Sequence, residues 1–421
     1  MNENIDYLRS ILQEQWQEFW AMDYGIEREQ LPTLKKMSSN PYAVIVSGFR
    51  RTGKSTLMRQ LAQNLGKESF YYVNFEDERF LDFTPKQWNT LYQTMLGMYG
   101  ERKIFIIDEV QNILGWERFV RRFADNGFKF YLTGSNAQLL SRELGTKLTG
   151  QYLSLEVFPF SFREFLDFKG VDKVNFKNPT TKERAIMLSH FAHYLLAGGI
   201  PNALKYPEAQ WHKTLYDNVL YKDVAARYKI NETRALQEAA FYLISNISSL
   251  ISFNKMKENL KLGSVNTVKN YVNYLEEAWL LFTVNVYDFS VKRQQIAAKK
   301  VYSIDTGLTR SVAFSFSENR GKLLENLVFL NLRRQSKEIY YYKTKTGKEV
   351  DFYLPRERLL IQSTQSMTDP LVNARETASI VEAMEETKIK QGLILTEEEE
   401  TYDHKKIKIM PIWKWLLLRK S

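Results

Sequence analysis

The sequence predicts an α/β protein whose first part is a doubly wound parallel sheet, and three observations lead to this prediction. An apolar run at residues 42–46 leads directly into the octet G-F-R-R-T-G-K-S at residues 48–55. A second apolar run, residues 104–107, ends in the two carboxylates Asp108 and Glu109. Segments with strand and helix character alternate around both runs, as they do where helices connect parallel strands.

The octet at residues 48–55 matches the phosphate-binding loop pattern G-x-x-x-x-G-K-[ST]. Its glycines let the backbone turn tightly, so that successive N–H groups point at phosphate oxygens. Lys54 is expected to reach the β- and γ-phosphates, and the Ser55 hydroxyl to ligate Mg²⁺. The helix expected over residues 55–65 directs its positive dipole end at the same phosphates. The pattern therefore predicts ATP and Mg²⁺ as ligands, bound by Gly48, Arg51, Thr52, Gly53, Lys54, Ser55 and Thr56.

The run that ends in Asp108 and Glu109 has the Walker B arrangement, a buried strand followed by two carboxylates. Asp108 is expected to hold the Mg²⁺ shell, and Glu109 to orient or deprotonate the attacking water. A further strand, expected over residues 129–132, ends in T-G-S-N. Asn136 at its tip is expected to sense the γ-phosphate, and a helix N-cap role is compatible with the same position. The predicted catalytic residues are Lys54, Glu109 and Asn136, and the predicted metal ligands are Ser55 and Asp108.

Composition narrows the classes of protein that remain. A chain of 421 residues is long enough for two or three domains. It has no cysteine, which excludes disulfides and cysteine-based zinc sites, and its four histidines are too scattered to predict a metal site. Because no apolar run approaches the ~18 residues of a membrane span, we expect a cytoplasmic protein with no membrane partner. The net charge of +10 permits a nucleic-acid or acidic partner and equally fits a solvated surface.

From about residue 158 the pattern becomes helical and stays so to about residue 252. A helix-turn-helix outline follows: a short helix at residues 253–260, the turn K-L-G-S, and an apolar-periodic helix at residues 265–277. A strand expected over residues 280–287 completes a winged-helix outline. DNA contacts would come from the exposed face of the second helix, which carries Asn266, Thr267, Lys269 and Asn270. With one Lys and no Arg on that face, a scaffold or protein-docking role stays equally open.

The last part, from about residue 317, has the pattern of a separate small α/β unit. A helix expected over residues 321–334 carries Glu325, and strands are expected at residues 339–343, 359–363 and 392–396. A helix is expected over residues 377–389. The chain then divides into an ATP-binding core with a helical lead-in (1–157), a helical lid or linker region (158–252), a winged-helix-like module (253–316) and the α/β unit (317–421).

Taken together, these motifs resemble a known family, the prokaryotic AAA-type ATPases of uncharacterised role that join a P-loop core to a C-terminal domain of unknown function. The resemblance implies ATP binding and says little about biological role. The matching segments are G-F-R-R-T-G-K-S, Y-V-N-F-E-D (72–77), I-I-D-E-V-Q (106–111), L-T-G-S-N (132–136), P-F-S-F-R-E-F-L (159–166), G-G-I-P (198–201), K-D (222–223), Y-S-I-D-T-G (302–307), L-E-N (324–326) and K-E-V-D-F (348–352).

One departure from the family pattern concerns hydrolysis. Family members commonly have L-x-G-R before the P-F-S-F segment, and here residues 148–151 read L-T-G-Q. If that arginine serves the nucleotide of a neighbouring copy, Gln151 removes it, and hydrolysis is expected to be slow. Arg121, Arg122 and Arg142 are alternative sources of the charge, and both a monomer and a ring are compatible with the sequence.

The C-terminal unit resembles the PD-(D/E)XK nuclease fold, in which acids on the first helix and on two strands hold Mg²⁺ beside a lysine. Glu325 and Asp351 fall where the first two acids belong. The third position falls at residues 362–364, Q-S-T, which supply neither carboxylate nor ammonium. We therefore expect a nuclease-like domain without cleavage activity. Glu325 is alternatively a buried hydrogen-bond partner, and Asp351 a cap of a strand turn.

The sequence thus predicts a Mg²⁺-dependent ATPase that couples its nucleotide state to a C-terminal region binding DNA or a protein partner. The alternative is a nucleic-acid-binding regulator that uses ATP as a switch with little hydrolysis.

Overall fold

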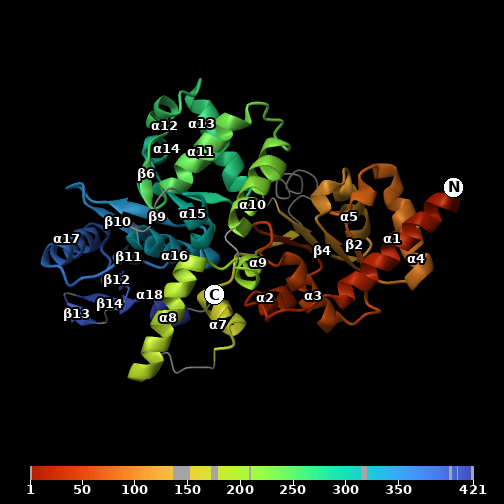
Figure 1. The fold of residues 1–421 in the computed structure, drawn as a ribbon, viewed down its shortest axis with the longest axis horizontal. Coiled ribbons are helices and arrows are strands. Elements are labelled where there is room, and N and C mark those ends of the chain that lie inside the picture. Colours follow the sequence, from red (N-terminus) through yellow and green to blue (C-terminus); the bar gives the residue numbers. More distant parts are fainter. Residues whose placement is uncertain are drawn as a thin grey trace. The chain divides into compact units, whose positions relative to one another are not determined.

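The chain folds as two compact units, Met1–Phe158 and Pro159–Ser421 (Figure 1). The computed structural model describes residues 2–135, 152–171, 179–207, 210–313, 320–397, 401–404 and 406–418. No helix within these ranges combines the length and the apolar character needed to cross a bilayer.

The first unit is built on a five-stranded sheet in the order β2-β3-β4-β1-β5, and every pairing in it is parallel. This confirms the parallel sheet predicted from the sequence. Ser47 of β1 is level with Gly134 of β4, and Ile107 of β3 is level with Leu132 of β4. The carboxyl ends of these three strands therefore meet at one edge of the sheet. The strands are β1 (Ala43–Ser47), β2 (Phe70–Asn74), β3 (Ile104–Asp108), β4 (Lys129–Gly134) and β5 (Tyr152–Glu156).

Helices cover this sheet and enclose two apolar clusters that it separates. One cluster is rich in aromatic rings from β3, α4 and α5, such as Trp88, Phe105 and Phe119. The other joins β1 and α3 to Phe19 of α1, so the amphipathic lead-in packs on the core. Gln15 of α1 also exchanges hydrogen bonds of 2.9 Å with the backbone N–H and C=O of Asn74. The helices are α1 (Asn2–Ala21), α2 (Leu31–Met37), α3 (Lys54–Leu65), α4 (Trp88–Tyr99) and α5 (Trp116–Ala124).

The second unit opens with helices and then forms a nine-stranded sheet in the order β13-β14-β12-β11-β10-β9-β7-β8-β6. The helices before the sheet are α7 (Phe162–Phe168), α8 (Thr181–Ala197), α9 (Pro201–Lys205), α10 (Gln210–Asn218) with a π-helical continuation (Val219–Ala225), and α11 (Thr233–Ser245). The other elements are β6 (Ser249–Ile251), α12 (Phe253–Asn259), α13 (Val265–Glu277), β7 (Leu281–Val286), α14 (Val291–Ile296), β8 (Lys299–Ser303), α15 (Thr306–Val312), α16 (Arg320–Gln335), β9 (Tyr340–Lys343), β10 (Glu349–Leu354), β11 (Leu359–Ser363), α17 (Pro370–Thr387), β12 (Gly392–Thr396), β13 (Thr401–His404), β14 (Ile407–Pro411) and α18 (Ile412–Leu418).

The strands that flank α12 and α13 and the strands of the C-terminal α/β segment belong to this one sheet. Strands β6 and β7 both pair antiparallel with β8, next to α12 and α13. Strand β7 then pairs in parallel with β9, where Asn285 is level with Tyr340. The apolar face of α13, which includes Val268, Val272 and Leu275, is buried. The two segments are thus joined by backbone hydrogen bonds rather than by a linker.

Helix α17 begins seven residues before the start expected from the sequence. Asp369 caps it by accepting a hydrogen bond from the Leu371 N–H, and Pro370 occupies the first helical position, where its missing N–H costs nothing. The expected bounds, residues 377–389, were therefore wrong at the N-terminal end.

A buried joint explains two glycine-containing motifs of the second unit. Asp305 accepts hydrogen bonds from the N–H groups of Gly199, at 2.6 Å, and Leu308, at 2.9 Å. A Cβ on Gly198 would lie 2.1 Å from Asp305 Oδ1, and one on Gly307 would lie 2.1 Å from the carbonyl oxygen of Ala197. Glycine is required at both positions because the end of α8 and the start of α15 approach each other this closely.

Candidate nucleotide-binding site

The loop at residues 48–53 connects the carboxyl end of β1 to the first turn of α3. A Cβ on Gly48 would lie 2.1 Å from the carbonyl oxygen of Val157, so only glycine fits there. Gly53 has a φ of 91°, in the left-handed region that favours glycine. Thr52 is buried and its hydroxyl donates to the Phe49 carbonyl at 2.9 Å. The loop therefore has the tight backbone that the sequence pattern predicts.

Lys54 reaches back across this loop. Its Nζ donates to the carbonyls of Gly48, at 3.2 Å, and Phe49, at 3.3 Å, and lies 3.6 Å from Glu109 Oε1. The side chain is only 5 % exposed, which makes the ammonium a buried positive charge beside the loop. Such a charge is placed to meet phosphate oxygens that the loop would hold. Arg51, by contrast, is exposed, with a φ of 63°.

Asp108 ends strand β3 and lies beside the start of α3. Its carboxylate accepts hydrogen bonds from the hydroxyls of Ser55 and Thr133. Thr133 at the end of β4 also accepts the backbone N–H of Glu109 at 3.0 Å, so one hydroxyl links both acids. Burial raises the pKa of Asp108, and the negative charge of Glu109 raises it further.

These oxygens fit a hard divalent cation. Mg²⁺ prefers oxygen ligands, and in sites of this kind it is held by a hydroxyl and a carboxylate with the substrate's phosphates. Ser55 and Asp108 lie in contact, and a cation beside them would favour the ionised form of the buried Asp108 carboxyl, whose pKa burial raises. The residues predicted as metal ligands therefore lie together.

Glu109 is held in an unusual backbone conformation next to Asp108. Its φ of 50° and ψ of 45° lie in the left-handed region, which costs a residue with a side chain some free energy. Gln111 Nε2 donates to Glu109 Oε2 at 2.6 Å, while Lys54 lies on the Oε1 side. The carboxylate is thus directed at the loop, where a water attacking the terminal phosphate would need a base.

Two residues at the site were not predicted from the sequence. Arg28, 1 % exposed, donates from Nη1 to the Thr52 carbonyl at 2.5 Å and from Nη2 to the Phe158 carbonyl at 2.9 Å. Thr133 belongs to the T-G-S-N segment, but the site residue predicted in that segment was Asn136. Asn136 and Gln151 lie outside the described residues. The structure therefore leaves untested both the γ-phosphate contact predicted for Asn136 and the loss of an arginine predicted from Gln151.

A second cluster of buried charge lies in the other unit, around Lys300 of β8. The Lys300 ammonium lies 2.7 Å from Glu349 Oε1, 2.8 Å from Asp351 Oδ1 and 3.0 Å from Glu325 Oε1. Since Lys300 is only 2 % exposed, the carboxylates are neutralised from within the chain. The structure brings together the two acids singled out in the sequence and adds a lysine that the pattern did not identify.

The third nuclease position, Gln362, completes a hydrogen-bond network instead of a metal site. Its Oε1 accepts the Asp351 N–H at 3.1 Å, and its Nε2 donates to Glu376 Oε2 at 2.7 Å. Ser363 N–H donates to Asp351 Oδ2 at 2.8 Å. In the part of the chain that the structure describes, no group of three or more His, Asp or Glu side chains is arranged to hold a metal ion.

Charge and burial oppose each other in this cluster. Burial raises the pKa of Glu325, and the charge of Asp351 acts in the same direction. Burial also opposes the charge on Lys300, but Asp351 and Glu325 outweigh it, so the pKa of Lys300 lies well above its usual value. The ammonium therefore stays charged at physiological pH.

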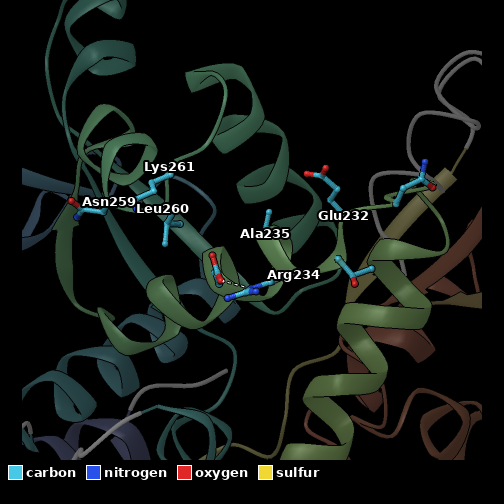
Figure 2. Close-up of a pocket in the computed structure, with 9 residues that line it drawn as sticks. Glu232, Arg234, Ala235, Asn259, Leu260 and Lys261 are labelled. Carbon is cyan, nitrogen blue, oxygen red and sulfur yellow. Dashed lines mark hydrogen bonds and ion pairs between the residues drawn. The ribbon is translucent and has the colours of Figure 1, made fainter.

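An open hollow of about 720 Å³ lies between the start of α11 and the end of α12 (Figure 2). Most of the residues that line it are polar or charged, among them Asn259 and Lys261. Arg234 Nε donates to Glu238 Oε1 at 3.0 Å, the contact drawn as a dashed line in Figure 2. The hollow is open and its charged groups are exposed, whereas a typical small-molecule site encloses most of its ligand.

Comparison with known protein families divides the chain into three segments. Residues 40–166 match the model of an AAA domain. Residues 188–319 and 320–415 match two domains of unknown function, DUF8612 and DUF4143. The AAA segment contains the loop, Lys54, Asp108 and Glu109.

The chain is 33% identical over 395 residues to the uncharacterized protein MJ1544 of Methanocaldococcus jannaschii, covering 89% of this chain and 88% of that protein. The chain belongs to the MJ1544 family. An uncharacterized protein of Haemophilus influenzae is 28% identical over 409 residues, covering 93% of this chain and 98% of that one. The family thus spans both units, and the names of these relatives record no activity.

Solved structures resemble the chain only distantly. A crystal structure of a DNA replication initiation factor has 16% identity and a TM-score of 0.27, covering 58% of this chain and 86% of that one. Cdc6p from Pyrobaculum aerophilum has 15% identity and a TM-score of 0.26, covering 72% and 93%. Scores this low carry no argument about this chain.

Replacing Thr133 with valine should weaken the acidic end of the site. The Glu109 N–H loses its acceptor, which is expected to cost about 1–3 kcal/mol of folding free energy. Asp108 loses a bond that favours its carboxylate, so its pKa rises further and nucleotide binding with Mg²⁺ is lost at a higher pH as the solution is acidified. Titrating the affinity for a fluorescent ADP analogue against pH measures the shift. Thr94→Val, another buried threonine of the same unit, should leave the pH profile unchanged.

Lys300→Met should destabilise the second unit strongly. Removing the ammonium leaves buried carboxylates without a counter-charge, a change that typically costs about 3–5 kcal/mol. Urea unfolding measures the loss. Lys299→Met removes the neighbouring, half-buried lysine and should cost far less. Adding Glu325→Gln and Asp351→Asn to Lys300→Met should recover part of the stability; no recovery would show that charge is not the cause.

Proposed function

We propose that the chain is a Mg²⁺-dependent ATPase whose nucleotide state controls the binding of its second unit to DNA or to a protein partner. One observation carries the ATPase part: Lys54, Ser55, Asp108 and Glu109 meet at one edge of a parallel sheet, beside a glycine loop. The match to an AAA domain over residues 40–166 supports it.

In this proposal the backbone of residues 48–53 surrounds the β-phosphate, and Lys54 neutralises the β- and γ-phosphate oxygens. Mg²⁺, held by Ser55 and the Asp108 shell, would supply further positive charge at the same oxygens. Glu109 accepts a proton from water as the water attacks the γ-phosphorus. The bond from that phosphorus to the β–γ bridging oxygen breaks, and ADP and phosphate leave.

The contact between Lys54 and Glu109 suggests how binding prepares hydrolysis. Lys54 Nζ lies 3.6 Å from Glu109 Oε1. Phosphate oxygens would compete for the same ammonium, because they carry more charge than one carboxylate. The Glu109 carboxylate would then be released from Lys54 and could accept a hydrogen bond from the attacking water.

For the second unit we propose a winged-helix module that contacts DNA through α13. The element order α11, β6, α12, α13, β7, β8 supports it, as does the pairing of β6 and β7 with β8. Asn266, Lys269 and Asn270 are exposed, on the side opposite the buried face of α13. Amides and a lysine can donate to base edges and phosphates.

A protein partner is the second candidate, because the segment between β7 and β8 exposes several apolar side chains beside the charged Lys292 and Arg293. Phe289 is 94% exposed, Ile296 74% and Val291 65%. Ile296 and Leu250 help to line a hollow of about 770 Å³, and Phe289 and Val291 are next in the chain to residues that line it. Exposed apolar side chains gathered in this way are typical of protein-binding surfaces.

We do not propose nuclease activity for the second unit. Cleavage would need a metal among Glu325, Asp351 and a third acid, and Lys300 already lies within 3.0 Å of both acids. The position of the third acid is Gln362, whose amide is bonded on both sides.

The ATPase proposal is tested by steady-state hydrolysis with Mg²⁺, with and without double-stranded DNA. Lys54→Ala should abolish nucleotide binding. Glu109→Gln should keep ATP bound and lower kcat by about 10²–10⁴-fold, the usual contribution of a general base. Glu78→Gln, at an exposed carboxylate of the same unit, is the control and should hydrolyse ATP normally. If Glu109→Gln hydrolyses ATP as fast as the unaltered chain, the assignment of the base is wrong. ATP binding with almost no turnover in the unaltered chain would favour the alternative, a nucleic-acid-binding regulator that uses ATP as a switch.

The two surfaces of the second unit can be separated by paired variants. Lys269→Glu with Asn270→Ala should weaken binding to double-stranded DNA about tenfold or more and lower its salt dependence by about one ion, as expected for a lost phosphate contact. Phe289→Ser with Ile296→Ser should leave DNA binding intact. Lys390→Glu, another exposed lysine of this unit, controls for net charge. Equal loss in the two lysine variants would assign DNA binding to overall charge and not to α13, and equal loss in all three would show a general effect on folding.

A further inference from the structure

We infer that Arg28 is a positioning residue that fixes the direction of the Gly53 N–H in the phosphate-binding loop; this inference rests on the proposed nucleotide binding. Arg28 comes from the segment between α1 and α2, well before the loop in the chain. Its Nη1 donates to the Thr52 carbonyl at 2.5 Å, and its Nη2 donates to the Phe158 carbonyl at 2.9 Å. The guanidinium thereby ties the loop to the segment that follows β5.

The geometry of the peptide bond turns this contact into an effect on the ligand. The C=O of Thr52 and the N–H of Gly53 belong to one planar trans peptide, so they point in opposite directions; the structure has no cis peptide among the residues it describes. When Arg28 holds the carbonyl, the Gly53 N–H is directed away from Arg28. A phosphate-binding loop works only if its N–H groups point at the anion.

Arg28 also limits the space for a side chain at position 53. A Cβ on Gly53 would lie 2.9 Å from Arg28 Nη1, closer than such contacts allow. Its φ of 91° would also strain any residue with a side chain. The second glycine of the motif is thus required by the arginine packed against it as well as by the turn.

Arg28 is itself held rigidly. Gln60 of α3 accepts the Arg28 N–H at 3.1 Å and donates to the carbonyls of Tyr24, at 2.8 Å, and Ile26, at 2.6 Å. Arg28 is 1 % exposed, so water does not compete for its bonds. A forked guanidinium can serve two carbonyls at once, which a lysine ammonium at the end of a flexible chain does poorly.

The test compares Arg28→Lys with Arg102→Lys. Arg102 is a matched control in the same unit, because it is also buried and donates to two backbone carbonyls, those of Lys67 and Phe70. Arg28→Lys should raise the Kd for ADP and the KM for ATP together, by about tenfold, and change kcat little. Both effects follow because the Gly53 N–H contacts a phosphate in the ground state and the transition state alike. Arg102→Lys should lower the unfolding midpoint without changing either constant.

Gln60→Ala is a milder variant that should raise the Kd for ADP in the same direction by a smaller factor, and it serves if Arg28→Lys does not fold. If the unaltered chain binds ADP and both Arg28→Lys and Gln60→Ala bind it equally well, the positioning role is refuted and the proposed function stands. If Arg102→Lys weakens binding as much as Arg28→Lys, the effect is general destabilisation and the role is refuted too. If the unaltered chain binds no ADP, the proposed function fails and this inference fails with it.

Discussion

The parallel pairing of β1, β3 and β4 is the constraint on which the first unit's chemistry depends. Each strand places its polar residues immediately after its last apolar one, and parallel register brings these ends to one edge. If β3 ran the other way, Asp108 would lie at the far edge of the sheet, a strand's length from Lys54. The register also decides in which of the two apolar clusters each side chain packs, because a slip of one residue exchanges the faces.

The buried lysines of the two units differ in how strongly their charges are compensated by neighbouring groups. In the first, Lys54 has weak partners: two carbonyls beyond 3 Å and a carboxylate at 3.6 Å. It can exchange them for a better anion at little cost. In the second, Lys300 has three carboxylates at 3.0 Å or less and almost no exposure. Giving up those contacts would leave the acids unpaired in a dry environment, so the ammonium stays. The first arrangement suits a site that exchanges ligands, the second a permanent support.

Sequence reasoning identified the parts of the site that depend on local spacing. Lys54, Ser55, Asp108 and Glu109 stand at fixed distances from a strand end or a helix start, and a short motif records such distances. The role of Arg28 was not predicted, because Arg28 lies 24 residues from the carbonyl to which it donates and no sequence pattern links the two positions. The ion pairs of Lys300 were not predicted for the same reason, because Lys300 lies 25 residues from Glu325 and 51 from Asp351. The parallel sheet was predictable from alternating patterns. The β7–β9 pairing was not, because nothing local in either strand specifies its partner.

The Lys300 cluster crosses a boundary that the family models place between residues 319 and 320. The lysine belongs to the segment before it, and Glu325, Glu349 and Asp351 belong to the segment after it. Backbone pairing of β7 with β9 crosses the same boundary. A chain cut there would leave a buried cation on one fragment and buried anions on the other, each beside an open sheet edge. The two segments therefore depend on each other physically, because separating them would leave buried charges unpaired and the backbone groups of a sheet edge without partners.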